Sequence, residues 1–254
     1  MNKFSYLPAV WPVNGPCDEQ RCPLNVHAVT TLKQGGVSTG DFSEYNLAAH
    51  VGDDLSAVET NRQKLMDDLQ LPAKPVWLVQ VHSNKVINAD EKITTVQADA
   101  SISRSKAVVC AVLTADCLPV FFCDQAGTEV AVAHAGWRGL HAGILTNTVK
   151  AMSASTVDIR VSFGPAIGPQ AFAVGEEVFQ AFVDKNRLNA AAFTATGNAH
   201  FLCDIYQLAR IELRSLGVDK IAGGDYCTYH ENQRFYSYRR QSNTGRMASL
   251  IWLS

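Results

Sequence analysis

The stretch from Ala107 to Thr114, which reads AVVCAVLT, contains no polar side chain before its final threonine. A run this short and this apolar is typical of a β-strand that is buried on both faces. Such a strand needs covering layers on both sides, so the chain must fold as layers around a sheet. The chain has 254 residues, 47% of them apolar, which is enough to build a core of that kind.

Helices and strands are predicted to interleave around this run, without the strict regularity of repeated βαβ units. A capping box formed by Ser56 and Glu59 favours a helix that starts near Asp54. No internal repeat or Pro/Gly/Ser-rich linker divides the chain, so we predict a single domain over residues 1–254, of α/β to α+β class with mixed sheets. The predicted strands are 26–32, 77–82, 107–114, 129–134 and 159–163, with paired strands over 235–252, and the predicted helices are 54–69, 140–152, 176–183 and 204–217.

The charge and the termini restrict the classes of partner. A formal net charge of −2 gives no bulk attraction to nucleic acid or to membrane surfaces. No stretch approaches the roughly 20 apolar residues of a membrane helix, and Pro8 and Pro12 interrupt the start of the chain, where a signal peptide would need a continuous apolar run. The seven cysteines are odd in number and scattered, which argues against a disulfide framework. We therefore expect a cytoplasmic protein.

Three predicted strands end in side chains that can bind a metal. In VWLVQVHS, residue alternation places Gln80 and His82 on one face, at the polar end of an otherwise apolar strand. Cys117 follows the apolar run directly, after Asp116, and His134 closes the strand in EVAVAHAG. Strand ends that open into loops are where a rigid scaffold presents functional groups.

Two histidines and one cysteine suit Zn²⁺, and three protein ligands leave the fourth tetrahedral position open for water or substrate. Each of these residues alone is better explained as a hydrogen-bonded core histidine or an inert buried cysteine. The coincidence of three such strand ends makes the metal site competitive with that explanation.

Arginines provide candidate anion sites. On the predicted helix 54–69, Arg62 shares a face with the inward-packing Val58 and Leu65, so its charge requires an anionic partner. A structural salt bridge is the commoner outcome, and a phosphate-binding site is the functional one. Arg138 in GWRG, at a predicted helix start, and the pair Arg239 and Arg240 are further candidates.

The motifs TTLKQGGVS, YNLAAHVGDD, QVHS, TADCLPVFF, HAGWRGL, GPAIGP and SYRR…TGRMAS span nearly the whole chain. Together they resemble the YfiH-like family, also called the multicopper polyphenol oxidase or laccase-domain family. The resemblance implies zinc ligation by His82, Cys117 and His134, and a single-domain mixed β-sandwich flanked by helices. That fold is similar to the deamidating toxins of the cytotoxic-necrotizing-factor type. Asn46, within YNLAAHVGDD, joins the substrate-binding candidates.

The resemblance also implies a choice of reactions. Family members are reported to cleave adenosine, inosine, guanosine and methylthioadenosine with phosphate, and to deaminate adenosine. A different role, the editing of peptidoglycan precursors, is also attributed to the family. For phosphorolysis, Arg62 or Arg138 would hold phosphate, with Gln80, Asn46 and Arg239 as further substrate contacts. For deamination, an open zinc site lowers the pKa of water to about 7.

Cys117, Asp116 and His134 are the expected catalytic residues, with Asp116 orienting a neighbour or transferring a proton. A copper-dependent polyphenol oxidase uses the same ligands, and a cysteine amidase would use Cys117 as nucleophile with His134 or His82 as base. The remaining alternative is a zinc-binding module without enzymatic activity.

We expect a purine nucleoside and phosphate as the partners, no nucleic acid, no membrane, and a monomer or weak oligomer.

Overall fold

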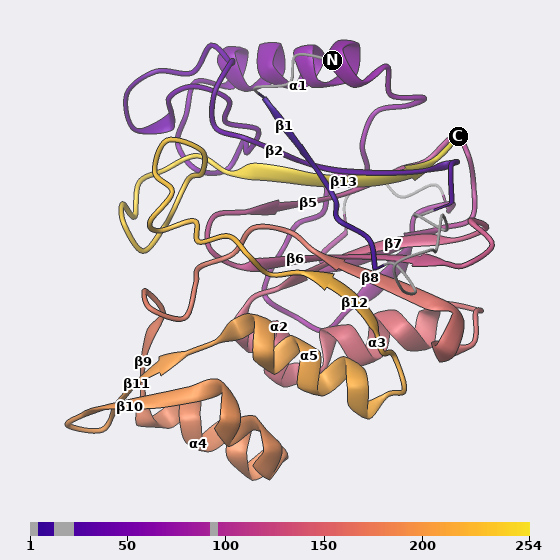
Figure 1. Ribbon diagram of the computed structural model, residues 1–254. Coiled ribbons are helices and arrows are strands. Elements are labelled where there is room, and N and C mark those ends of the chain that lie inside the picture. The colour runs from indigo at the N-terminus through magenta and orange to yellow at the C-terminus, as the bar shows by residue number, and fades with distance from the viewer. Residues whose placement is uncertain (1–4, 13–22, 92–95) are drawn as a thin grey trace.

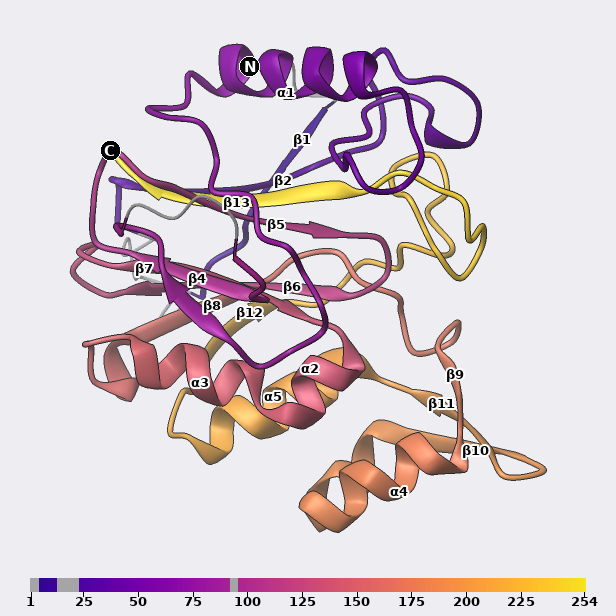
Figure 2. The same cartoon turned by 180° about the vertical axis from the view of Figure 1, so that it is seen from behind.

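The computed structural model describes residues 5–12, 23–91 and 96–254. Two β-sheets are stacked between an upper layer formed by α1 and a lower layer formed by α2, α3 and α5 (Figure 1). A third, small sheet and α4 lie to one side of the lower layer (Figures 1 and 2). The expected mixed sandwich flanked by helices is therefore present, with one additional sheet.

The upper sheet has the strand order β1-β2-β13-β5, the lower sheet β12-β8-β6-β7-β4-β3, and the small sheet β10-β11-β9. The strands are β1 (Tyr6–Pro8), β2 (Val26–Thr31), β3 (Val86–Asn88), β4 (Ala100–Ser103), β5 (Val109–Thr114), β6 (Leu118–Asp124), β7 (Val130–Ala135), β8 (Ile159–Phe163), β9 (Ala173–Gly175), β10 (Phe193–Gly197), β11 (His200–Cys203), β12 (Lys220–Gly223) and β13 (Met247–Leu253). The α-helices are α1 (Leu55–Leu69), α2 (Trp137–Ala142), α3 (Ile144–Ala151), α4 (Glu176–Lys185) and α5 (Ile205–Ser215), and the 3₁₀ helices are η1 (Gly40–Phe42), η2 (Thr156–Asp158) and η3 (Arg187–Ala192). None of the helices in the described part of the chain is long and apolar enough to cross a membrane.

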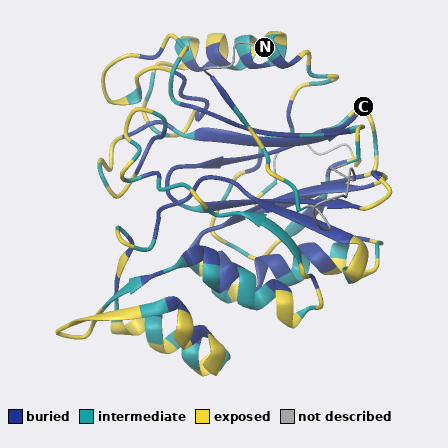
Figure 3. Cartoon of the chain, in the orientation of Figure 1, coloured by how far each residue is buried: buried dark blue, intermediate teal, exposed yellow. Residues whose placement is uncertain are grey.

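The apolar run 107–114 contains strand β5, which is buried along its whole length. Cys110 and Val112 belong to the core between the two sheets. Ala111 and Leu113 belong to the core beneath α1. Both faces are therefore covered, as predicted, and Figure 3 shows the strands of both large sheets buried along most of their length.

The segment 77–82 is not a strand, which corrects the prediction. Within it, Val79 makes an isolated bridge with Gln97, and Val76, just before it, makes one with Cys110. The side-chain amide of Gln80 takes the place of a strand partner: its Oε1 accepts from the backbone N–H of Leu113 at 2.7 Å and its Nε2 donates to the Leu113 carbonyl at 2.8 Å. Figure 2 shows the segment between α1 and β3 crossing from the helix layer to the lower sheet.

The prediction of one helix over 140–152 and the predicted capping of the helix 54–69 also differ from the structure. The predicted helix 140–152 is two helices, because Gly143 adopts a left-handed conformation with φ of 90° between α2 and α3. The N-cap of α1 is Asp54, whose carboxylate accepts from the backbone N–H groups of Ser56 and Ala57. The capping box of Ser56 and Glu59 is therefore wrong, since Ser56 lies inside the helix.

The predicted paired strands over 235–252 are wrong except for β13. Within 235–246 the chain forms turns, and the side chain of Arg240 joins them to the preceding segment. Arg240 donates from Nη1 to the carbonyls of Thr228 and Tyr229 and from Nη2 to that of Phe235. Strand β6, in contrast, was not predicted, although it is buried throughout.

The five cysteines in the described part of the chain are free thiols: Cys110, Cys117, Cys123, Cys203 and Cys227. Cys17 and Cys22 lie outside the described residues.

Candidate metal centre and active site

The side chains of His82, Cys117 and His134 converge, as predicted. Their potential ligand atoms all lie within 4.8 Å of one another. Cys117 directly precedes β6, and His134 lies in β7 opposite Pro119, so the antiparallel β6–β7 pairing brings these two together. His82 reaches them from the segment tethered by Gln80, and its φ of 59° turns the chain there.

Asp99, directly before β4, is fully buried and organises the three residues. One carboxylate oxygen lies 2.9 Å from Nδ1 of His134 and 3.0 Å from the backbone N–H of His82. The other accepts from the backbone N–H of Ser83 at 2.6 Å and from its hydroxyl at 2.7 Å. With Nδ1 of His134 donating to Asp99, its Nε2 is left as the free ligand atom.

Sequence reasoning did not identify Asp99. The available signal was an acidic residue in the apolar context of ADAS, where an unpaired carboxylate could not remain buried.

The electrostatics of the cluster favour a thiolate. Burial alone would raise the pKa of the Cys117 thiol, but the charge of His134 and hydrogen bonds from both histidines lower it to about 6. Burial opposes protonation of His134, yet the adjacent Cys117 and Asp99 raise its pKa to about 9. Burial would raise the pKa of Asp99, and the hydrogen bonds from His134 and Ser83 bring it down to about 2.

The donor set and its spacing fit Zn²⁺. Zn–N bonds of about 2.0–2.1 Å and a Zn–S bond of about 2.3 Å place nitrogen and sulfur ligands about 3.6 Å apart in a tetrahedral site. The observed distance between Cys117 Sγ and His82 Nε2 is 3.8 Å. A Cβ at Gly136 would approach Cys117 Sγ and His82 Cδ2 to 2.9 Å each, so only glycine leaves the ligand side chains room. Copper would accept the same donors.

A cavity of about 520 Å³ opens beside the three residues. This volume is within the usual range of small-molecule sites, roughly 300–1,000 Å³. Its lining consists of His50, Gln80, His82, Leu113, Thr114, Ala115, Asp116, Cys117, His134, Trp137, Arg138, Ile167, Phe172, Ile205, Tyr238, Arg239 and Arg246.

Asp116 is the one carboxylate in this lining, and both of its oxygens are engaged. Oδ1 accepts from the Thr228 hydroxyl and Oδ2 from the backbone N–H of Arg239, each at 2.6 Å. Asp116 itself has φ of 87°, a conformation that a non-glycine residue adopts at a cost of about 1–3 kcal/mol. The carboxylate thus ties three loops together at the cavity wall.

Three arginines line the cavity. Arg138 stacks on Trp137, with 4.4 Å between the guanidinium carbon and the ring centre. Arg239 lies over Phe172 and donates from Nη1 to the carbonyl of Ala173. Arg246, which sequence reasoning missed although it lies in the quoted TGRMAS motif, donates from Nη1 to the carbonyls of Thr244 and Gly245.

The remaining candidates are placed differently. Gln80 lines the cavity, but its amide is bonded to Leu113. Arg62 and Asn46 do not line the cavity: Arg62 donates from Nε and Nη2 to the carbonyl of Leu47, and Asn46 is fully buried. Arg240, the neighbour of Arg239, donates to the backbone carbonyls of Thr228 and Phe235.

Comparison with known proteins gives consistent matches over nearly the whole chain. The family model described as multi-copper polyphenol oxidoreductase laccase matches residues 27–254. The purine nucleoside phosphorylase YfiH of Escherichia coli K12 is 52% identical over 91% of this chain and 95% of its own length. The purine nucleoside phosphorylase of Pseudomonas aeruginosa is 50% identical over the same shares.

Two solved structures share the fold. A Neisseria meningitidis protein superimposes with a TM-score of 0.92 at 47% identity, covering 98% of this chain and 99% of that one. YlmD of Geobacillus stearothermophilus gives a TM-score of 0.83 at 27% identity, covering 97% and 99%. The chain thus belongs to the YfiH-like purine nucleoside phosphorylase family, whose family model carries the laccase description.

Proposed function

We propose that this protein is a zinc-dependent purine nucleoside phosphorylase that acts on adenosine, inosine, guanosine and methylthioadenosine. Zinc would be held by His82, Cys117 and His134. The observation that carries the proposal is the charge of the adjoining cavity, in which three arginines are accompanied by a single carboxylate whose oxygens are already bonded.

That imbalance favours an anionic ligand. A guanidinium cannot lose its charge, so an anion stabilises it; the effect is largest at Arg246, which is half-buried, whereas Arg138 and Arg239 are exposed. Arg246 has its pKa lowered by burial, and the nearby Cys117 and Asp116 only partly offset this. Arg138, Arg239 and Arg246 are therefore the residues we assign to the phosphate, in place of the direct contact first predicted for Arg62.

The apolar part of the cavity suits the nucleoside. Trp137, Phe172 and Tyr238 contribute aromatic rings, each with a guanidinium over one face, and Ile167 and Ile205 contribute aliphatic surface. Flat aromatic rings stack with other aromatic rings at small entropic cost. The relatives named as purine nucleoside phosphorylases support this assignment.

In phosphorolysis, a phosphate oxygen attacks C1′ of the ribose while the bond between C1′ and N9 of the purine breaks. The base leaves with the bonding electron pair and takes up a proton, and the sugar leaves as the 1-phosphate. The arginines would bind and orient the attacking phosphate, and Asp116 would hold the backbone of Arg239 in place. Asp99 would keep His134 in one tautomer. Zinc, when bound, supplies Lewis acidity, which also supports adenosine deamination as a second activity of this centre.

The test is base release from inosine by zinc-loaded protein, followed with and without phosphate. We expect hypoxanthine and ribose 1-phosphate in equal amounts, and no hypoxanthine when phosphate is omitted. Hypoxanthine release that does not depend on phosphate would indicate a hydrolase, and absence of release from zinc-replete protein would refute the proposal.

A second candidate, a cysteine amidase, is favoured by one specific observation. Cys117 would be the nucleophile, His134 its base and Asp99 the acid that orients the base, since Nδ1 of His134 lies 2.9 Å from Oδ1 of Asp99. Such an enzyme would work without metal. Turnover of a peptidoglycan precursor that survives chelation and is lost in Cys117→Ser would favour the amidase over the phosphorylase.

The family model's laccase description raises a copper oxidase as the remaining alternative. Coupling to dioxygen reduction requires a further copper cluster with its own histidines. Over residues 5–12, 23–91 and 96–254, no second group of metal-binding side chains accompanies the trio. A blue absorption band that bleaches on reduction, in protein purified without added metal, would support the oxidase.

A further inference from the structure

Asn46 is fully buried, and its amide has no capacity left for a substrate. Nδ2 donates to the carbonyl of Ala48 at 3.1 Å and to Asp53 at 2.8 Å. Oδ1 accepts from the backbone N–H groups of Ala48 and Arg246, each at 3.0 Å. Both donors and both lone pairs are used, so Asn46 joins the turn that follows it to the backbone of Arg246.

Arg62 holds the same turn from helix α1. Its Nε and Nη2 both donate to the carbonyl of Leu47, at 3.0 and 2.8 Å. The guanidinium also lies over Trp77, 4.4 Å from the ring centre. A planar donor pair that is fixed in this way acts as a rigid clamp on one carbonyl.

The clamped turn ends at His50, which lines the cavity together with Arg246. The proximity of the three basic groups is visible in the pKa of His50, which is lowered by desolvation and by the positive charges of Arg246 and Arg62. Asn46 is thus bonded on one side to the chain that carries His50 and on the other to Arg246 itself.

We propose that Asn46 and Arg62 are positioning residues that set the spacing between His50 and Arg246, and that His50 is a further phosphate-binding side chain. This inference rests on the proposed function in taking inorganic phosphate as the ligand. It assigns Arg62 an indirect role, exerted through the carbonyl of Leu47, instead of direct contact with the substrate.

The test is a double-mutant cycle read by isothermal titration of inorganic phosphate into the zinc-loaded full chain, without nucleoside. Arg62→Met keeps a stem to pack on Trp77 and removes the donors to Leu47. Because hydrogen bonds to charged groups contribute at the upper end of the usual range, we expect Arg62→Met and His50→Ala each to weaken phosphate binding about tenfold. If Arg62 acts through His50, the double variant should lose little beyond either single one, about tenfold to twentyfold in total.

Two variants control for folding and for charge. Arg62→Lys, which retains a cation and a donor, should restore affinity to within about threefold of the wild type. Lys64→Ala on the same helix, which removes an ion pair with Asp68, should leave phosphate affinity unchanged. Equal zinc content and melting temperature across the set would show that the metal centre and the fold are intact.

Additive losses of about a hundredfold in the double variant would mean that Arg62 contacts phosphate itself, and would overturn the inference. Wild-type affinity in Arg62→Met, or no phosphate binding by the wild type, would overturn it as well. Failure of phosphate-dependent inosine cleavage would refute only the proposed function, because the titration contains no nucleoside.

Discussion

The same strands of the lower sheet carry two different kinds of polar site at their two ends. At one end, Asp99 precedes β4, Cys117 precedes β6 and His134 lies near the end of β7. At the other end, Arg104 follows β4, Asp124 closes β6 and Glu129 precedes β7. The antiparallel β6–β7 pairing therefore separates a candidate metal centre from a purely structural network.

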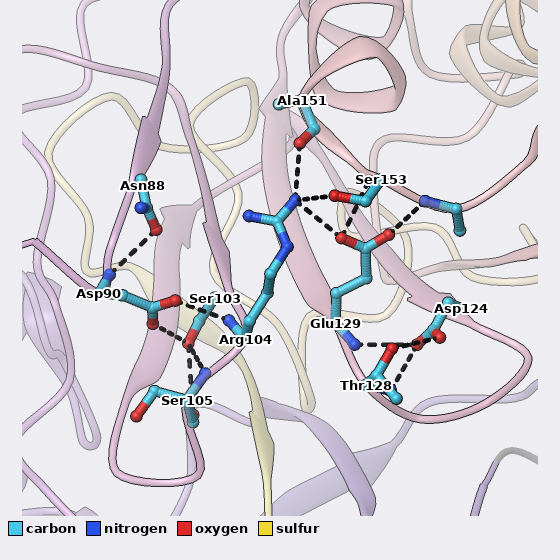
Figure 4. Close-up of polar contacts among 11 residues, drawn as sticks. Asn88, Asp90, Ser103, Arg104, Ser105, Asp124, Thr128, Glu129, Ala151 and Ser153 are labelled. Atoms are coloured by element: carbon cyan, nitrogen blue, oxygen red, sulfur yellow. Dashed lines mark hydrogen bonds and ion pairs between the residues drawn. The ribbon is translucent and has the colours of Figure 1, made fainter.

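In the structural network, acid groups are saturated by neighbouring donors (Figure 4). Asp124 accepts from the backbone N–H groups of Thr128 and Glu129 and from the Thr128 hydroxyl. Glu129 accepts from the backbone N–H groups of Ser153 and Ala154 and forms an ion pair with Arg104 at 2.9 Å. These bonds close the hairpin and fasten the chain after α3.

At the candidate metal centre, Asp99 is saturated in the same way, but the side chains beside it converge as potential metal ligands. Nε2 of His82 lies 3.8 Å from Sγ of Cys117, and the backbone has positive φ values of 59° at His82 and 87° at Asp116. The comparison shows that a buried carboxylate can stabilise a turn at one end of a strand and, at the other end, hold side chains open toward a cavity.

The largest expected effect is the loss of a metal ligand. Cys117→Ala should reduce zinc affinity by about 10³-fold or more, since a structural zinc site gains about 10–16 kcal/mol from its whole ligand set. The melting temperature of the metal-free protein should change little. Zinc content by mass spectrometry and thermal unfolding test both statements, and a variant that retains stoichiometric zinc would contradict the assignment of the ligands.

Removing the acid at the structural end should affect stability instead. Glu129→Ala leaves two backbone N–H groups without an acceptor and Arg104 without its anionic partner, so we expect the free energy of unfolding to fall by about 3 kcal/mol. Zinc affinity should stay at the wild-type value.

Arg104→Ala is the matched control. The Arg104 side chain is 40% exposed, so its removal should lower the free energy of unfolding by about 1 kcal/mol or less. Urea unfolding measures both, and a loss of zinc binding in Glu129→Ala would break the separation between the two ends.

Asp99→Asn should weaken zinc binding by about 10–100-fold, the usual effect of changing the group that orients a histidine ligand. Asn presents an N–H group where Asp99 accepts bonds from Ser83, so the turn that carries His82 should also loosen. Competition with a coloured zinc chelator measures the affinity. An unchanged affinity would show that His134 does not need Asp99 to remain in its ligand tautomer.

The smallest effect concerns the reactivity of Cys117 in metal-free protein. Its thiol, with a pKa of about 6, is protonated below that pH and reacts slowly; above it the thiolate predominates, so alkylation should rise with a midpoint near pH 6. At pH 7 the rate should exceed that of an ordinary thiol only about fivefold, because nucleophilicity falls as the pKa falls. Burial raises the pKa of Cys110 to about 12, which makes it the internal control. Peptide mass spectrometry after iodoacetamide treatment reports both sites, and a midpoint near pH 9 for Cys117 would contradict its coupling to His134.

Much of the fold followed from local pattern. The apolar run at 107–114 predicted a strand covered on both faces, which is confirmed as β5. The helix 54–69 is confirmed as α1, although the capping box from which it was predicted is not formed. The segment 77–82 has an equally strand-like pattern, but Gln80 bonds to Leu113 through its side chain, so the periodicity was misleading.

The sequence by itself determined the buried strand β5 and brought out His82, Cys117 and His134 as candidate metal ligands, because an apolar run is a local signal and the motifs around these three residues are specific. Tertiary structure alone decided that Asp99 orients His134 from 35 residues away, that Arg246 lines the cavity and that Arg62 and Asn46 do not line it. Such contacts depend on how strands pair and how turns are bonded across the fold. They produce no periodic pattern in the sequence, because the partner that stabilises a buried charge lies far from it along the chain.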